Sequence, residues 1–234
     1  MRLIYNILYF TGGHVADDAC ASGVNNCAEA NLDVQYLMAV SQRTPTTYYY
    51  WNSTSDLWEG FLVNLASRRG SSTTPLVVSI SYVSPEYQFS ATYLRNFNME
   101  ALKLAAQGVT IIVASGDDGV NCAQGFCSTA APVCGYSPVF PASSPYVTAV
   151  GATQVSLVLK MTCFLLSFVI PYIFTRGVVQ GPEVNSNETA CSRSTSGVIT
   201  SGGGFSNIFR APSFQQAVVS QYLNSTIGLS AAAG

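Results

Sequence analysis

The order of apolar and polar positions along the chain predicts alternating helices and strands. Apolar side chains recur at helical spacing in three stretches: 27–40, 58–69 and 90–108. Gly108 supplies a stop signal at the end of the third stretch. Continuous apolar runs, typical of strands buried on both faces, occur at 75–82, 109–114 and 146–153. A short aromatic strand is expected at 46–51.

Strands separated by helices in this order favour right-handed crossovers and a parallel sheet. The predicted fold class is therefore α/β. In such sheets ligands bind beyond the carboxyl ends of the strands. The turn Ser115–Gly119 follows the 109–114 strand, so Asp117 is expected where chemistry takes place.

The first helical stretch, "CAEANLDVQYLMAV", carries two acids on one face. Glu29 and Asp33 are four residues apart, beside an apolar series that includes Leu32, Leu37 and Val40. We expect an amphipathic helix in which the two like charges repel by about a few tenths of a kcal/mol. Acids in a first helical turn also favour the helix dipole, and that explanation alone accounts for many such pairs.

Composition narrows the classes of partner. Hydrophobic residues make up 48% of the 234 residues and charged residues only 9%, against about 25% in a typical soluble domain. The net charge is −2 and no basic run occurs, which argues against nucleic acid as a partner.

Cysteines and glycosylation sequons favour the secretory pathway. The chain has seven cysteines, and we expect two or three disulfides. A zinc site is disfavoured because His14 is the only histidine and no Cys-x-x-Cys pair occurs. Sequons for N-glycosylation begin at Asn52, Asn187 and Asn224.

Two apolar segments raise the question of a membrane. The start, "MRLIYNILYFTGGH", has no convincing cleavage site, and we interpret it as a core strand or a ragged chain start. The run Met161–Phe174 is shorter than the roughly 20 residues that span a bilayer, and Pro171 interrupts it. Membrane association is therefore not the favoured interpretation, although a tether formed with 155–175 stays open.

Four motifs resemble one enzyme family in content and order. They are "EANLD", "ASGDDG", "PVFPASSPYVTAVGAT" and "TSGGGFSN". The chain resembles the sedolisins, the serine-carboxyl peptidases, and in particular their tripeptidyl-peptidase I branch. The resemblance covers roughly 25–154 and 197–224. It implies a subtilisin-like, doubly wound, mostly parallel sheet with helices on both faces, and a peptide or protein substrate.

The resemblance also implies roles for single residues. Glu29 resembles the general base beside the nucleophilic serine, and Asp33 resembles the acid that orients this glutamate. Asp117 resembles the oxyanion-hole residue. Ser81 and Tyr82 resemble the residues nearest the cleft on the strand that pairs with the substrate backbone. Val83 stands where many relatives have glycine. His14 faintly resembles a subtilisin histidine motif, but the helix that follows matches the glutamate family.

These residue types suit catalysis in acid. An unperturbed glutamate has a pKa of about 4.3, so it can accept a proton where a histidine would already be protonated. Two carboxyls one turn apart can share a proton and titrate as a pair. Asp117 must carry a proton to donate a hydrogen bond to an oxyanion, which again favours low pH.

Parts of the family pattern are absent. The nucleophile of the family lies in a Ser-Gly-Thr-Ser motif, which this sequence lacks, and Ser230 stands in only a faintly similar setting. From the resemblance, we expect that the calcium ligands and the prodomain of the family do not fall within these 234 residues. We therefore interpret 1–234 as a partial peptidase domain with an atypical apolar insertion at about 155–180, centred on Met161–Arg176.

The favoured function is a fragment of an acid-acting serine-type peptidase that releases tripeptides, located in a lysosome, a vacuole or outside the cell. As written, the chain is expected to be inactive. The alternative is a non-catalytic pseudo-peptidase that binds extended peptides by strand addition.

Overall fold

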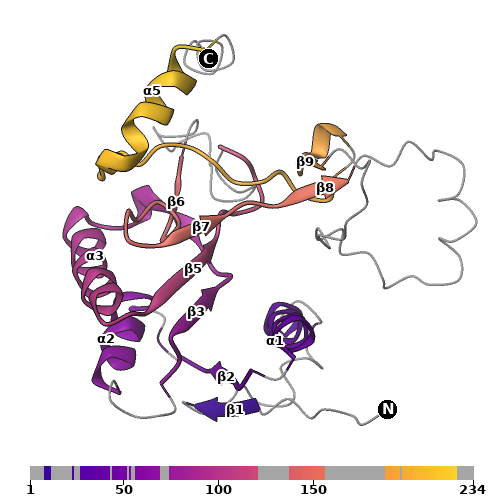
Figure 1. Ribbon diagram of the computed structural model, residues 1–234, viewed down its shortest axis with the longest axis vertical. Helices are drawn as coiled ribbons and strands as arrows, with labels where there is room; N and C mark the ends of the chain where they lie inside the picture. Colours follow the sequence, from indigo (N-terminus) through magenta and orange to yellow (C-terminus); the bar gives the residue numbers. More distant parts are fainter. Residues whose placement is uncertain are drawn as a thin grey trace, which may run out of the picture. The chain divides into compact units, whose positions relative to one another are not determined.

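The computed structural model describes residues 8–11, 23, 27–42, 44–51, 53, 56–68, 74–120, 137–155, 188–195 and 197–225. These residues form helices, short 3₁₀ turns (η) and strands in an α/β order (Figure 1). The elements are β1 (Leu8–Thr11), α1 (Ala28–Ser41), β2 (Thr46–Tyr49), α2 (Glu59–Ser67), β3 (Val77–Ile80), β4 (Ser84–Pro85), η2 (Glu86–Gln88), α3 (Ala91–Ala106), β5 (Thr110–Ala114), β6 (Val139–Phe140), β7 (Thr148–Val150), β8 (Thr153–Val155), β9 (Glu188–Ala190), η3 (Arg193–Thr195), η4 (Ser213–Gln215) and α5 (Gln216–Leu223).

The chain divides into two compact units. The first comprises 1–81 and 95–111, and the second comprises 82–94 and 112–234. A parallel sheet has the strand order β3-β5-β7 (Figure 1). The first two residues of β5 belong to the first unit, as does β3, and its last three belong to the second unit, as does β7. The predicted α/β class with a parallel sheet is confirmed.

The first unit packs its helices against one another and against β2. On α2, Leu62 and Leu65 are buried, and on α3, Phe97, Ala101 and Leu104 recur at helical spacing and are fully buried. A hydrogen bond between the side chains of Glu59 and Asn96 joins the two helices. Strand β2 pairs in parallel with β1, and Tyr49 of β2 packs edge-on against Phe61 of α2 at 5.1 Å between ring centroids.

The end of α3 follows the sequence signal. Gly108 adopts a left-handed φ of 81°. Its N–H donates to the carbonyl of Ala105, and the N–H of Val109 donates to the carbonyl of Leu104. This pair of bonds is the Schellman arrangement, which glycine favours because it has no Cβ to clash.

In the second unit, β5 pairs in parallel with β7, with Ile112 opposite Thr148. Strands β4 and β6 form a short antiparallel pair, and β8 pairs antiparallel with β9. Phe140 of β6 is fully buried, and the ring of Phe89 packs against it at 5.6 Å between centroids. This unit carries the turn that contains Asp117.

Two predictions of strand burial are wrong. Strands β3 and β7 were expected to be buried on both faces, yet Val77 is 60% exposed and all three residues of β7 are exposed. Both are outer strands of the three-stranded sheet, whereas the central strand β5 buries Ile111 and Val113. Continuous apolar sequence therefore did not mean burial on both faces here.

Helix α1 has the expected position but not the expected apolar face. None of its residues is buried, and Val40 is 83% exposed. At about 100° per residue, its apolar side chains spread over roughly two thirds of the helix circumference. The sequence therefore offers no single stripe that could pack against a core, and the amphipathic prediction is wrong.

Candidate active site

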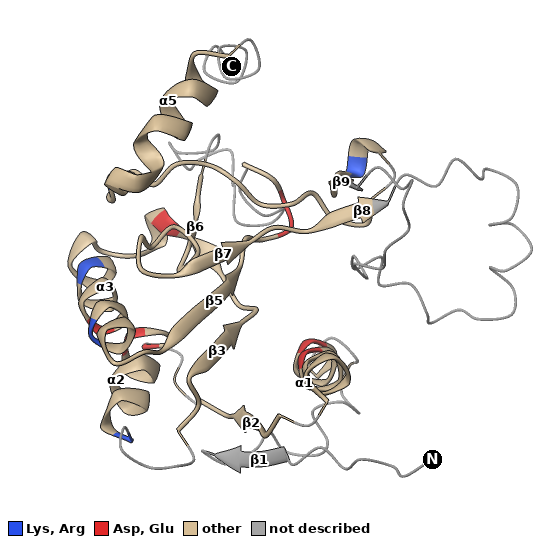
Figure 2. Cartoon of the chain, in the orientation of Figure 1, with Lys and Arg blue, Asp and Glu red and all other residues tan. Residues whose placement is uncertain are grey.

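Helix α1 carries the predicted base and its partner. Glu29 lies in the first turn and Asp33 follows one turn later, and both side chains are half-buried. Figure 2 shows acidic residues on α1, and the helix contains no Lys or Arg. The residue before the helix, Cys27, is disulfide-bonded, as expected for a protein with disulfides. The helix thus presents two acids with no cation of its own beside them.

The Asp33 side chain forms a hydrogen bond with the residue that follows β3, in the same unit. The Ser81 hydroxyl, one residue beyond β3, donates a hydrogen bond to Asp33 Oδ1 at 2.9 Å. Burial raises the pKa of the Asp33 carboxyl above its ordinary value, and the Ser81 hydrogen bond opposes part of this shift. Asp33 therefore keeps a proton at higher pH than a solvated aspartate does.

The raised pKa of Asp33 predicts how its contribution to folding stability changes with pH. Between the ordinary value of 3.8 and the raised value, the folded state binds more protons than the unfolded state. The free energy of unfolding therefore falls as pH rises through this window. The stabilisation is complete below pH 3.8 and is lost as pH passes the raised pKa.

The measurement is the urea midpoint of the wild-type chain and of Asp33→Asn across acid pH, since the amide does not titrate. We expect the wild-type midpoint, relative to that of the variant, to decrease with rising pH. A difference that stays constant or grows would show that Asp33 does not titrate in this way.

Asp117 lies in the second unit, in the turn that follows β5. Its side chain is exposed, and its carbonyl accepts a hydrogen bond from the Thr200 N–H at 2.8 Å. The Thr200 carbonyl in turn accepts from the Gly119 N–H at 3.0 Å. Gly116 and Gly119 have φ values of 93° and 70°, which side chains with a Cβ rarely adopt. Two glycines and one paired segment therefore fix the backbone around Asp117.

The glycine-rich segment 201–204 continues this pairing. The Gly202 N–H donates to the Gly116 carbonyl at 2.8 Å, and the Gly203 N–H donates to the Gly119 carbonyl at 3.2 Å. A Cβ at position 202 would lie 1.7 Å from the Ser115 carbonyl oxygen, so only glycine fits there. In the structure, "SGGGFS" lies directly on the "SGDDG" turn.

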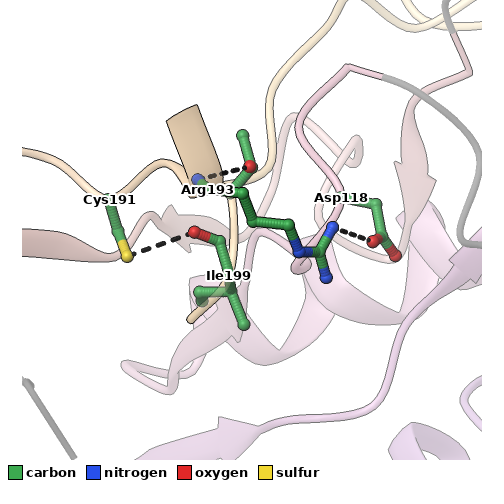
Figure 3. Close-up of polar contacts among 5 residues, drawn as sticks. Asp118, Cys191, Arg193 and Ile199 are labelled. Atoms are coloured by element: carbon green, nitrogen blue, oxygen red, sulfur yellow. Dashed lines mark hydrogen bonds and ion pairs between the residues drawn. The ribbon is translucent and has the colours of Figure 1, made fainter. Parts of the chain in front are cut away.

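An ion pair ties the same turn to η3. Arg193 Nη1 lies 2.7 Å from Asp118 Oδ1, and the Arg193 N–H donates to the Thr200 hydroxyl at 3.1 Å (Figure 3). Cys191, a free and buried cysteine, donates from Sγ to the Ile199 carbonyl at 3.3 Å. Because the Arg193–Asp118 pair is partly exposed, water screens it and its contribution to stability is small. The ion pair therefore orients the turn but contributes little to the free energy of unfolding.

Among the described residues, one buried acid was not predicted from the sequence. Glu86, in η2, is 2% exposed, and its carboxylate accepts hydrogen bonds from the Ser206 hydroxyl at 2.6 Å and the Asn207 N–H at 2.8 Å. The Ser206 hydroxyl also accepts from the N–H groups of Ile208 and Phe209. Glu86 therefore anchors the end of the glycine-rich segment. Its partners lie 120 residues away along the chain, so no local pattern indicated this role.

The structure brings some predicted site residues together and leaves others apart. Asp33, one helical turn after Glu29, is in contact with Ser81 in the first unit. Asp117 belongs to the second unit. Tyr82 is 55% exposed at the start of the second unit. Asn224 is exposed at the end of α5. The remaining candidates lie outside the described residues: His14, Asn52, Asn187, Ser230 and the expected insertion Met161–Arg176.

The described part of the chain shows neither a cluster of metal-ligating side chains nor a helix that could cross a membrane. Within it, no three His, Cys, Asp or Glu side chains are grouped closely enough to hold a metal ion. Among the helices described there, none combines the length and the apolar character that a bilayer crossing requires.

Comparison with known proteins finds relatives of this chain. No family model matches the chain. Tripeptidyl-peptidase 1 from Bos taurus is 36% identical over 201 residues, which cover 85% of this chain and 29% of that protein. The Homo sapiens protein of the same name is 35% identical over the same span. The chain thus spans less than a third of the length of these curated relatives.

A solved structure has a fold similar to that of this chain. Pseudomonas sedolisin, a serine-carboxyl proteinase solved with two molecules of pseudo-iodotyrostatin, superposes with a TM-score of 0.60 at 23% identity. The match covers 92% of this chain and 54% of the sedolisin chain. The chain is therefore a homologue of tripeptidyl-peptidase 1 with the fold of the sedolisins.

Proposed function

We propose that this chain supplies the acid–base half of a peptidase that hydrolyses peptide bonds at acid pH. In this proposal Glu29 is the general base that takes a proton from a serine nucleophile. Asp33 orients Glu29 and shares its proton, and Asp117 donates a hydrogen bond to the oxyanion. The substrate is a peptide or protein from which tripeptides are released.

The observation that carries the proposal is the state of Asp33. It is a half-buried carboxyl with a raised pKa, one helical turn from Glu29, in a homologue of a tripeptidyl-peptidase. A carboxyl that keeps its proton to higher pH than usual lets its neighbour carry the single negative charge of the pair. Glu29 is then ionised and able to act as a base at a pH where histidine would be protonated.

The oxyanion role of Asp117 is supported by its backbone. The turn that bears it is fixed on both sides by the pairing with Thr200 and Gly202. Stabilisation of an oxyanion depends on a donor that is positioned before the reaction, and losing one such donor costs about 10² to 10³ in rate in subtilisin. A protonated aspartate can serve as that donor.

The nucleophile is the missing part of this apparatus. The 234 residues contain no Ser-Gly-Thr-Ser motif, so we propose that they form part of a peptidase domain and do not cleave peptides by themselves. The test is an assay of this chain with fluorogenic peptides from pH 3 to 7, a range set by the ordinary pKa values of carboxyl and imidazole groups, about 4 and 6.5. We expect no turnover above background. Turnover that Ser230→Ala abolishes would place the nucleophile within the chain and contradict this part of the proposal.

A second candidate function is peptide binding without cleavage. It is favoured by β3, an outer strand of the sheet whose Val77 and Ser79 are exposed. An extended peptide could add to such an edge through main-chain hydrogen bonds. Fluorescence anisotropy with labelled extended peptides separates the candidates: saturable binding by the chain, together with an intact peptide after long incubation even when the family's nucleophile segment is present, would favour the pseudo-peptidase.

The compartment and the calcium ion of the family are also proposals for this chain. The disulfide at Cys27 and the sequons support a lysosomal, vacuolar or extracellular location. Calcium is expected for the full-length family members, and we propose that its ligands lie outside the residues described here. The roles proposed above for Glu29, Asp33 and Asp117 do not involve that ion.

A further inference from the structure

We propose that the Ser81 side chain is a positioning residue for Asp33: its hydroxyl holds Oδ1 and thereby directs Oδ2 toward the proton that Asp33 shares with Glu29. This inference rests on the proposed function. It assigns to Ser81 a role different from the expected one, in which the residue lines the substrate cleft. The two roles use different atoms, since substrate pairing uses the backbone and positioning uses the hydroxyl.

The geometry supports a specific contact rather than an incidental one. Ser81 Oγ and Asp33 Oδ1 are 2.9 Å apart, although the residues are 48 positions apart in the sequence. The contact joins α1 to the carboxyl end of β3, two elements of the same unit. A helix that buries none of its own residues is held only weakly by apolar packing. A directional bond to a strand is therefore an effective means of fixing the acid in place.

Among the described residues, Ser81 is the side chain that forms a hydrogen bond with the Asp33 carboxyl. On α1 the other acid in reach is Glu29, one turn earlier, and Tyr36 lies almost one turn later. Strand β2, which contacts α1, consists of threonines and tyrosines, which are uncharged in acid. Strand β3 contains no titratable side chain. Among the described residues, burial raises the pKa of Asp33 and the Ser81 hydrogen bond lowers it.

The sign of the Ser81 contribution follows from hydrogen-bond chemistry. A hydroxyl donates more strongly to an ionised carboxylate than to a neutral carboxyl. Ser81 therefore lowers the pKa that burial raises, and its removal should raise the pKa of Asp33 further. A residue that only fills space would not change this titration in that direction.

The test follows the Asp33 side-chain carboxyl by NMR in the full chain labelled with ¹³C-aspartate, as a function of pH. We expect Ser81→Ala to move the titration midpoint of Asp33 to higher pH and Ser81→Thr, which keeps the hydroxyl, to leave it near the wild-type value. Ser79→Ala, an exposed position on the same strand, is the matched control and should have no effect. If the alanine variant does not fold, Ser81→Cys, a weaker donor of similar size, should shift the midpoint in the same direction.

An Asp33 titration that is the same in wild type, Ser81→Ala and Ser81→Cys would overturn the inference. A shift produced equally by Ser79→Ala would do so as well, because the effect would then not be specific to the hydroxyl. The experiment needs no substrate and no nucleophile. Its failure is therefore distinguishable from failure of the peptidase proposal, which only an assay of peptide hydrolysis can show.

Discussion

Replacing Gly202 by alanine is expected to destabilise the second unit by at least about 3 kcal/mol, at the upper end of what forced overpacking costs. The added Cβ would lie 1.7 Å from the Ser115 carbonyl oxygen and 2.4 Å from its carbonyl carbon. Both atoms belong to the backbone, so no side-chain rotation can relieve the clash. The two segments would have to separate.

Separation would also break hydrogen bonds. The Gly202 N–H to Gly116 carbonyl bond would be lost first, and the pairing of Thr200 with Asp117 and Gly119 adjoins it. Each buried backbone group left without a partner costs about 1 to 3 kcal/mol. The backbone that places Asp117 would thus lose its support together with the stability of the unit.

Gly203→Ala is the matched control for this prediction. Among the described residues, a Cβ at position 203 would meet only Val120 Cγ1, at 3.4 Å, which is ordinary van der Waals contact. Urea unfolding followed by circular dichroism, with hydrogen exchange of the Thr200 amide, should show a large loss for Gly202→Ala and about 1 kcal/mol or less for Gly203→Ala. Equal midpoints for the two variants would refute the close approach of the two segments.

Local patterns predicted the secondary structure well because the signals are local. Helix α3 and its stop at Gly108 follow from apolar spacing and a left-handed glycine, and the observed helix ends at Ala106. Burial was predicted poorly, since it depends on what other elements cover a segment. The exposed β7 and the uncovered α1 illustrate this limit.

In the candidate site, too, local features were predicted from the sequence and contacts between distant residues were not. The motifs indicated Glu29, Asp33 and Asp117 because each lies in a short recognisable pattern. The contacts that support them join distant parts of the chain: Ser81 with Asp33, Arg193 with Asp118, and Ser206 with Glu86. No property of a single segment indicates which distant partner it meets, so these supporting residues emerged only from the structure.

The central claim is that Glu29 is a catalytic base rather than an ordinary first-turn acid. A chimera tests it most directly: the stretch of bovine tripeptidyl-peptidase 1 that this chain matches is replaced by the residues of this chain, so that the rest of that enzyme is retained. Glu59 provides the matched control, because it is the first-turn acid of α2 as Glu29 is of α1.

The measurement is kcat/KM for tripeptide release at acid pH by the chimera, its Glu29→Gln variant and its Glu59→Gln variant, all verified as folded by circular dichroism. We predict that the chimera is active, that Glu29→Gln lowers kcat/KM by about 10² to 10⁴, the usual contribution of a general base, and that Glu59→Gln changes it little. A folded Glu29→Gln variant as active as Glu59→Gln would contradict the claim.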